Sequence, residues 1–267
     1  MAKTIAVCNQ KGGVGKSTTA VNVASYLASF GKKTLLVDLD PQGNATVSLG
    51  VNRVDINRTV YETLVEDLSS SEVIIKSSID RLELLPSSLD LAGAEVKLAQ
   101  MPQRELILKN VCASVNDRYD VILMDCPPSL GLLTINALVA SDVVLIPVQC
   151  EYLALEGLNA LVHTIQLVKT ELNPSLEIGG IVLTMVDARS NLTKEVADEV
   201  KRFFKDLVCT TQIPRNVRLA ECPSHGKPIM LYDAHSSGAE AYAALTNELL
   251  AKVIEKPAPT PSAVLAG

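Results

Sequence analysis

The segment from Lys11 to Ser17 has the residue types and the spacing of a phosphate-binding loop. It follows an apolar run at residues 4–7, which predicts a strand, and it precedes residues 20–28, which predict a helix. A glycine-rich turn at the start of a helix directs several backbone N–H groups at one point, and the helix dipole adds positive potential there. The sequence therefore predicts a polyphosphate site formed by Lys11, Gly12, Gly13, Val14, Gly15, Lys16, Ser17 and Thr18.

The loop departs from the standard motif at two positions. That motif is Gly-x-x-x-x-Gly-Lys-Ser/Thr, and its first glycine would fall at Gln10, whereas Lys11 adds a cation that the ordinary loop lacks. Lys16 is expected on the β- and γ-phosphates. The hydroxyl of Ser17 is a suitable hard ligand for Mg²⁺, and Thr18 is placed to reach the α-phosphate.

Two aspartates follow the next predicted strand, at residues 34–37. Carboxylates at the C-terminal end of a parallel strand lie on the edge where open α/β sheets bind ligands. Asp40 is therefore predicted to orient or deprotonate an attacking water. In the alternative interpretation, Asp38 and Asp40 only cap the following turn, which the dipeptide Asp40-Pro41 favours.

A third strand, predicted at residues 121–124, ends in Asp125. An aspartate at this position of a phosphate-binding fold contacts Mg²⁺, usually through water, and Gly131 could then sense the γ-phosphate as a hinge. The expected base is adenine, because a guanine-specific site carries an Asn-Lys-x-Asp loop and residues 184–187 supply nothing equivalent.

Composition and periodicity predict an α/β fold. With 267 residues and 48% hydrophobic content, the chain can bury a large core. Short β-branched runs alternate with helical patterns, which predicts a doubly wound, mainly parallel β-sheet flanked by helices, of the P-loop NTPase type. Further strands are expected at 143–148 and 181–186, helices at 104–115, 153–170, 192–207 and 239–254, and a helix with an edge hairpin within 52–89. We expect a single domain over 1–255 and disorder over 256–267.

Cysteines, apolar runs and net charge narrow the class of protein. The six cysteines include no Cys-x-x-Cys pair and no His/Cys cluster at metal spacing, so we expect reduced thiols and a cytoplasmic protein. No apolar run approaches the roughly 20 residues of a membrane-spanning helix. The formal net charge of −6 argues against a wholly basic nucleic-acid coat, although it leaves room for a local basic face.

Three motifs together resemble the ParA family of chromosome- and plasmid-partition ATPases. They are the Walker A loop with its signature lysine at residues 11–17, the acidic run at 38–42, and the run at 125–129. The resemblance extends over residues 2–255 and includes 151–157 and 213–216. MinD division-site ATPases and nitrogenase iron proteins are wider relatives. The resemblance implies ATP and Mg²⁺ as cofactors and a weak ATPase activity that a partner protein stimulates.

The resemblance also implies that two subunits close on ATP as a homodimer. Lys11 would reach the phosphates of the other subunit, and Gly12 would let the two loops approach closely. A triphosphate needs more positive charge than Lys16 and one Mg²⁺ provide, and this supports a second lysine; a solvated loop lysine is the alternative. By the same resemblance, Asp40 positions the water, Asp125 holds Mg²⁺ through its hydration shell, and the adenine is surrounded by Met185, Pro214 and Asn216.

The segment from residue 189 to residue 227 is locally basic, with eight Lys or Arg against five Asp or Glu. The charge count alone is also consistent with an ordinary solvent-exposed surface that binds no DNA. The resemblance favours non-specific binding of duplex DNA through phosphate contacts, together with a ParB-type centromere-binding partner and a nucleoid-associated location. The predicted DNA contacts are Arg189 and Arg218 first, then Lys201, Arg202 and Arg215.

The main alternative is a MinD-like membrane-surface ATPase. Such a protein needs a C-terminal amphipathic helix with basic and bulky apolar faces, yet residues 257–267 contain no Lys, Arg or aromatic residue and three prolines. An iron–sulfur role would need two cysteines at a dimer interface, and neither Cys112 nor Cys126 is suitably placed in the predicted elements. A small-molecule kinase is a further alternative, but the sequence contains no recognisable insertion that would bind a phosphate-accepting substrate.

Overall fold

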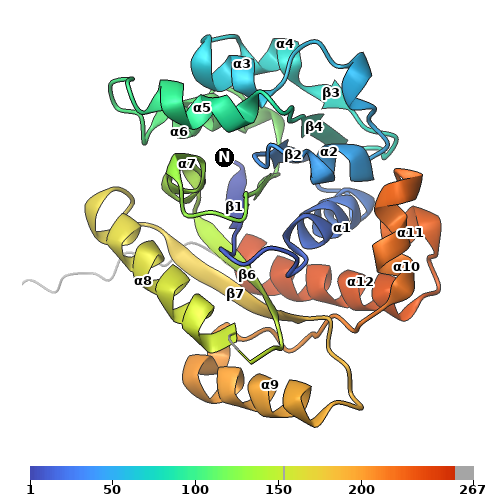
Figure 1. Ribbon diagram of the computed structural model, residues 1–267. Coiled ribbons are helices and arrows are strands. Elements are labelled where there is room, and N and C mark those ends of the chain that lie inside the picture. Colours follow the sequence, from blue (N-terminus) through green and yellow to red (C-terminus); the bar gives the residue numbers. More distant parts are fainter. Residues whose placement is uncertain (153, 256–267) are drawn as a thin grey trace, which may run out of the picture.

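A seven-stranded sheet runs through the computed structural model, which describes residues 1–152 and 154–255 (Figure 1). Its order is β3-β4-β2-β5-β1-β6-β7, and each neighbouring pair is parallel except the edge pair of β3 and β4. This confirms the predicted doubly wound, mainly parallel sheet. The strands are β1 (Lys3–Val7), β2 (Thr34–Asp38), β3 (Ile75–Lys76), β4 (Leu82–Leu85), β5 (Val121–Asp125), β6 (Val143–Gln149) and β7 (Glu177–Thr184).

Helices cover both faces of this sheet (Figure 1). The helices are α1 (Lys16–Ser29), α2 (Asn44–Ser48), α3 (Val60–Val65), α4 (Ser70–Val73), α5 (Leu91–Leu98), α6 (Ile107–Ala113), α7 (Leu132–Ala140), α8 (Ala154–Glu171), α9 (Asn191–Phe204), α10 (Val217–Glu221), α11 (Ile229–Tyr232) and α12 (Ser237–Leu249). A π-helical turn, Leu250–Ile254, follows α12.

Strand β5 explains why the central strands read as continuous apolar runs. Val121 and Leu123 pack with α1 and α12, whereas Ile122 and Met124 pack with α7 and α8 on the other face. Side chains alternate between the two faces of a strand, so both sets must be apolar when helices cover both faces. The result is a two-sided core whose middle layer is the sheet.

The ends of β1, β2 and β5 meet at one edge of the sheet. The register pairs Val7 with Asp125 and Asp38 with Asp125. Strand β1 also lies between β5 and β6. The strand order reverses at this position, because later strands of the chain are added on both sides of β1. Open α/β sheets bind ligands outside this edge. The three predicted motifs therefore come together because the strands that carry them are neighbours.

Several predicted boundaries were wrong, each for a local reason. Helix α1 begins at Lys16 rather than at 20, because Gly15 turns the chain directly into it. The last strand runs over Glu177–Thr184 rather than 181–186, because Met185 adopts a left-handed conformation (φ 51°) that ends the strand. Helix α6 covers Ile107–Ala113, since residues 104–106 form turns.

The segment 52–89 contains two short helices, α3 and α4, where one helix was expected, and the predicted edge hairpin is formed by β3 and β4. A capping box stabilises the start of α3, with Thr59 and Glu62 exchanging hydrogen bonds. The predicted disordered tail, 256–267, lies outside the described residues.

Candidate nucleotide-binding site

The connection from β1 to α1 has the backbone shape of an anion-binding loop. Gly13 and Gly15 have φ values of 74° and 89°, which side chains other than glycine rarely adopt. Helix α1 has no side-chain cap at its N-terminus and no acidic residue in its first turn. Its N-terminal N–H groups and its dipole therefore remain available to a negatively charged ligand.

Strands β6 and β7 hold the loop in place through hydrogen bonds between side chains and backbone carbonyls. The side-chain amide of Asn9 donates to the carbonyl of Pro147 at 2.7 Å. The Thr184 hydroxyl donates to the carbonyl of Val14 at 2.9 Å. Sequence reasoning missed Asn9 and Thr184, because their partners are carbonyl groups that any residue would supply. The one available signal was the place of Thr184 at the end of a parallel strand.

The loop lysine Lys16 is buried beneath this loop, with 6% of its surface exposed. Its Nζ donates to the carbonyl of Lys11 at 3.0 Å. Burial lowers the pKa of Lys16, while the carboxylates of Asp125 and Asp40 oppose that change. The charge of Lys16 therefore interacts with the aspartates that end β5 and follow β2.

Asp38 has a structural role in this cluster. Its carboxylate accepts hydrogen bonds from the Thr46 N–H at 2.8 Å, the Thr46 hydroxyl at 2.7 Å and the Asp40 N–H at 3.2 Å. Burial raises the pKa of Asp38 to about 6, although these hydrogen bonds lower it. The alternative interpretation, in which this aspartate stabilises the following turn, therefore fits Asp38.

Asp125 is fully buried, and neither of its carboxylate oxygens has a hydrogen-bond partner within the described residues. The Ser17 hydroxyl lies close enough to lower the pKa of Asp125 without meeting hydrogen-bond geometry. Burial and then the charge of Asp38 raise that pKa well above its usual value. A buried carboxylate without a donor is unfavourable unless a cation compensates it. The pair of Ser17 and Asp125 therefore fits Mg²⁺, which prefers hard oxygen ligands and retains water.

Asp40 lies beside this pair with its backbone fixed. Its carbonyl accepts a hydrogen bond from the Ser87 hydroxyl at 2.7 Å, and its Oδ1 accepts from the Gln42 N–H at 2.9 Å. Its Oδ2 has no such partner in the part of the chain that the structure describes. Asp40 therefore combines the turn contact of the alternative interpretation with one carboxylate oxygen available to a ligand.

The signature lysine Lys11 is held by its own subunit in this structure. Its Nζ lies 2.5 Å from Oε2 of Glu151, and the other oxygen of Glu151 accepts from the Gln149 side chain at 2.5 Å. Both charged side chains of the pair are about half exposed, at 41% and 47%. An exposed pair of this kind contributes roughly 0–1 kcal/mol, so Lys11 can leave it at little cost.

The three residues predicted around the adenine surround one small cavity together with the loop. The cavity has a volume of 160 Å³. Asn216 is the N-cap residue of α10, and its side chain donates to the Ser237 hydroxyl at 2.9 Å. The residues that line the cavity include Gly15 and Thr18 of the loop, together with Met185, Pro214, Asn216 and Tyr242. Tyr242 was not predicted, because a tyrosine within an apolar helix reads as core.

Comparison with known proteins gives matches along nearly the whole chain. The sporulation initiation inhibitor protein Soj of Bacillus subtilis is 55% identical over 251 residues, which cover 94% of this chain and 99% of that protein. The chromosome partitioning protein ParA of Myxococcus xanthus is 52% identical over 250 residues, with 94% and 88% covered. The chain belongs to the ParA family of partition ATPases.

A domain match and a solved structure agree with this ParA-family assignment. The family model described as an AAA domain matches residues 2–178. The crystal structure of cobyrinic acid a,c-diamide synthase from Mycobacterium smegmatis, with a bound ATP analogue and magnesium, is similar with a TM-score of 0.82. It is 37% identical, and the match covers 94% of this chain and 95% of that one. Both the recognised family and the predicted P-loop fold are thereby confirmed, and the prediction of ATP and Mg²⁺ is supported.

The five basic residues predicted to contact DNA come from different parts of this ParA-family fold. Lys201 and Arg202 lie on α9, which packs on the α7 and α8 face, whereas Arg218 lies on α10 near α1. Three of the five are engaged with their own chain: Arg189 with Asp187 at 3.1 Å, Arg202 with Glu199 at 3.4 Å, and Arg218 with Glu221 at 3.0 Å and Asp233 at 3.5 Å.

Lys201 and Arg215 have no ion pair within residues 1–152 and 154–255. Arg215 also lines the 160 Å³ cavity, so its charge faces the nucleotide side of the molecule as well. Lys201, whose charge no ion pair among the described residues compensates, is therefore a better candidate for a phosphate contact than Arg189, which is paired with Asp187.

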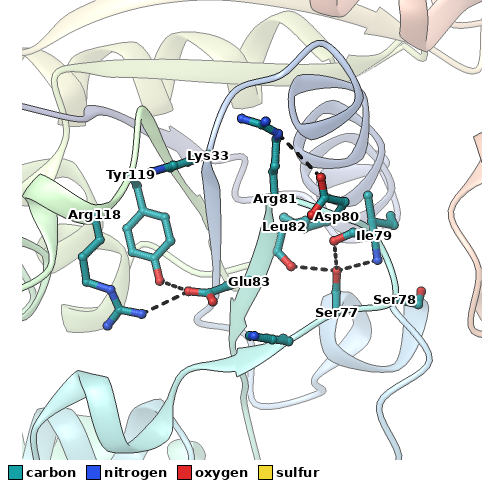
Figure 2. Close-up of a pocket in the computed structure, with 11 residues that line it drawn as sticks. Lys33, Ser77, Ser78, Ile79, Asp80, Arg81, Leu82, Glu83, Arg118 and Tyr119 are labelled. Atoms are coloured by element: carbon teal, nitrogen blue, oxygen red, sulfur yellow. Dashed lines mark hydrogen bonds and ion pairs between the residues drawn. The ribbon is translucent and has the colours of Figure 1, made fainter.

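A separate, larger cavity lies at the opposite ends of the strands (Figure 2). Its volume is 680 Å³, and it includes Lys33 just before β2, Leu82 at the start of β4 and Tyr119 just before β5. Glu83 in this cavity is bound by Arg118 at 3.2 Å and by the Tyr119 hydroxyl. No predicted site residue lines it, so in this fold cavity size does not locate the nucleotide site.

Membrane insertion has no support among the described helices, since none combines the length and the apolar content that a span requires.

Proposed function

We propose that this chain is an ATP-hydrolysing switch that dimerises with ATP, binds duplex DNA without sequence preference, and takes part in chromosome or plasmid segregation. A centromere-binding partner of the ParB type raises its slow intrinsic rate. The observation that carries the proposal is the second lysine of the loop: Lys11 is half exposed at a position where its own subunit gives it only an exposed ion pair.

The first part of the proposal is the nucleotide site. Lys16 and the N-terminus of α1 bind the phosphates, and the cavity beside Met185 receives the adenine. Ser17 and Asp125 hold Mg²⁺, Asp125 through water, and the ion neutralises part of the phosphate charge. Asp40 orients the attacking water with the carboxylate oxygen that Gln42 does not occupy.

The second part is the dimer, and Gly12 gives it a sharp test. A Cβ at Gly12 would meet no atom within 4 Å, and its backbone has no positive φ, so a side chain fits within the subunit. Gly12→Val is therefore expected to leave ATP binding unchanged while dimerisation weakens about 100-fold, because overpacking costs about 1–3 kcal/mol at each of two symmetric contacts. Sedimentation equilibrium with Mg²⁺ and ATP measures the dimer.

Gly93→Val is the matched control, because Gly93 also has open space around it and lies on α5. It should dimerise like the unmodified protein. If Gly12→Val also dimerises normally with ATP, the two loops do not approach each other and the sandwich arrangement is wrong.

The third part is DNA binding, which Arg218→Glu probes. Each protein charge that neutralises a phosphate releases counterions, so losing one contact should lower the slope of log affinity against log salt by about 1 per subunit. DNA retention should fall at every salt concentration while the ATP-dependent dimer persists. The Arg218 side chain is exposed by 55%, which makes such a contact accessible.

Arg58→Glu is a suitable control, since Arg58 is similarly exposed and is also paired with a carboxylate, Glu72. The control should retain DNA, and both variants should unfold at similar temperatures. If Arg218→Glu and the unmodified protein retain DNA equally at low salt, Arg218 does not contact DNA.

The whole proposal is tested by co-sedimentation with duplex DNA in ATP, in ADP and without nucleotide, at several salt concentrations. We expect retention with ATP alone and a steep decrease with salt. Vesicles of anionic lipid form a parallel arm. Sedimentation with the vesicles instead of DNA would replace the partition function with a MinD-like one.

A further inference from the structure

The side chain of Glu95 on helix α5 contacts the start of α7. Its Oε1 accepts a hydrogen bond from the Leu133 N–H at 3.2 Å. A Cβ built on Gly131 would lie 2.1 Å from this Oε1, and the three nearest atoms are all from Glu95. Since real Cβ contacts of this length do not occur, Gly131 can carry no side chain while Glu95 stays in place.

Helix α7 depends on this contact because it has no cap of its own. Gly131 is its N-cap residue, with extended backbone angles (φ −79°, ψ −172°) and no side chain to accept a hydrogen bond. The first turn of α7 also contains no acidic residue. Glu95 supplies both the acceptor and the negative charge that the helix N-terminus favours, from a position 38 residues away in the chain.

Gly131 also ends the segment that begins at the nucleotide site. Residues 126–130 connect it to Asp125, whose carboxylate lies near Ser17 and Lys16. One end of this segment is thus fixed by the sheet beside the loop, and the other by Glu95. A segment fixed at both ends can take up only a few positions, so a change in charge at one end selects between them.

We propose that Glu95 is a positioning residue that holds the segment 126–131 so that it distinguishes a third phosphate from its absence. This inference rests on the proposed function and names the regulation of the same site. Without Glu95, the start of α7 loses its cap and the segment is no longer restrained at Gly131. Binding of ATP then has to order it, which weakens ATP binding, whereas ADP makes no such demand.

The first test compares nucleotide affinities. Glu95→Ala should bind a non-hydrolysable ATP analogue with Mg²⁺ about fivefold more weakly, the size expected for one lost helix cap, while ADP affinity stays unchanged. Glu95→Gln keeps an acceptor oxygen and should restore most of the difference. Glu171→Ala, on an exposed end of α8, is the matched control.

Amide exchange supplies a readout specific to the segment. In the unmodified protein, residues 126–136 should exchange more slowly with the ATP analogue than with ADP. Glu95→Ala should enlarge this difference, because the segment is then unrestrained with ADP and is ordered only by the ATP analogue. If Glu95→Ala lowers both affinities equally, or leaves the exchange difference unchanged, the role of Glu95 is only structural and the proposal is wrong.

The second test uses Gly131 and needs no nucleotide. Gly131→Ala should lower the unfolding temperature because its methyl group collides with Glu95, and the double variant with Glu95→Ala should be less destabilised than the sum of the two changes. If the effects of the two changes on the unfolding temperature are additive, Gly131 and Glu95 are not in contact. Absence of ATP-dependent dimerisation in the unmodified protein would instead reject the proposed function, while the comparison of ATP-analogue and ADP affinities would still decide whether Glu95 positions the segment.

Discussion

Replacing Lys16 by alanine is expected to weaken ATP binding about 100-fold or more, since a hydrogen bond to a charged group contributes about 1.5–3 kcal/mol and Lys16 is positioned to make more than one. The buried ammonium lies among Asp125 and Asp40 at the foot of the loop. Titration with a fluorescent ATP analogue in the presence of Mg²⁺ measures the loss.

The variant needs a folding control, because Lys16 also binds the carbonyl of Lys11 at 3.0 Å and offsets the charge of the aspartates. Its unfolding temperature without nucleotide separates the two effects. Lys109→Ala, which removes an exposed lysine on α6, should leave affinity intact. Nucleotide affinity of Lys16→Ala close to that of Lys109→Ala would show that the phosphates bind elsewhere.

Asp40→Ala is expected to reduce ATP hydrolysis about 100-fold or more while nucleotide binding and dimerisation persist, because loss of a positioned base or water ligand has an effect of this size. The variant should remain trapped on DNA with ATP. Single-turnover hydrolysis and DNA co-sedimentation, measured on the same samples, separate chemistry from binding.

Asp40→Asn divides the two roles of this residue. The asparagine oxygen can still accept the hydrogen bond from the Gln42 N–H, so the turn is retained while the charge is lost. We expect this variant to fold like the unmodified protein and to hydrolyse ATP as slowly as Asp40→Ala. Normal hydrolysis in either variant would show that Asp40 takes no part in ATP hydrolysis and that its only role is the hydrogen bond within the turn.

The residues of the candidate nucleotide site could be predicted because they follow parallel strands. The phosphate-binding loop connects the end of β1 to α1, Asp40 follows the end of β2, and Asp125 ends β5. Neighbouring parallel strands bring their C-terminal ends to one edge of the sheet. Once the strands are identified from their apolar runs, the site follows. The 160 Å³ cavity proposed for the adenine could not be predicted from strand positions, and the choice of Met185, Pro214 and Asn216 depended on the family resemblance.

Contacts between distant segments could not be predicted. The pair of Lys11 with Glu151 spans 140 residues, and Glu95 meets Leu133 across the gap between α5 and α7. Glu151 and Glu95 are ordinary charged residues, and nothing in the sequence indicates their partners. The predicted first choices for DNA, Arg189 and Arg218, illustrate the same limit, because their own-chain partners are visible only in three dimensions.

The central claim, that Lys11 completes the site of a second subunit, is tested most directly by mixing two inactive variants, Lys11→Ala and Asp40→Ala. In a mixed dimer, the Lys11→Ala subunit retains its own Lys16 and Asp40 and receives Lys11 from its partner, so one complete site forms. We predict that an equimolar mixture regains roughly a quarter of the unmodified ATPase rate, since half of randomly paired dimers are mixed and each has one complete site of two. A mixture no more active than the separate variants would contradict the account, because Lys11 would then act within its own subunit.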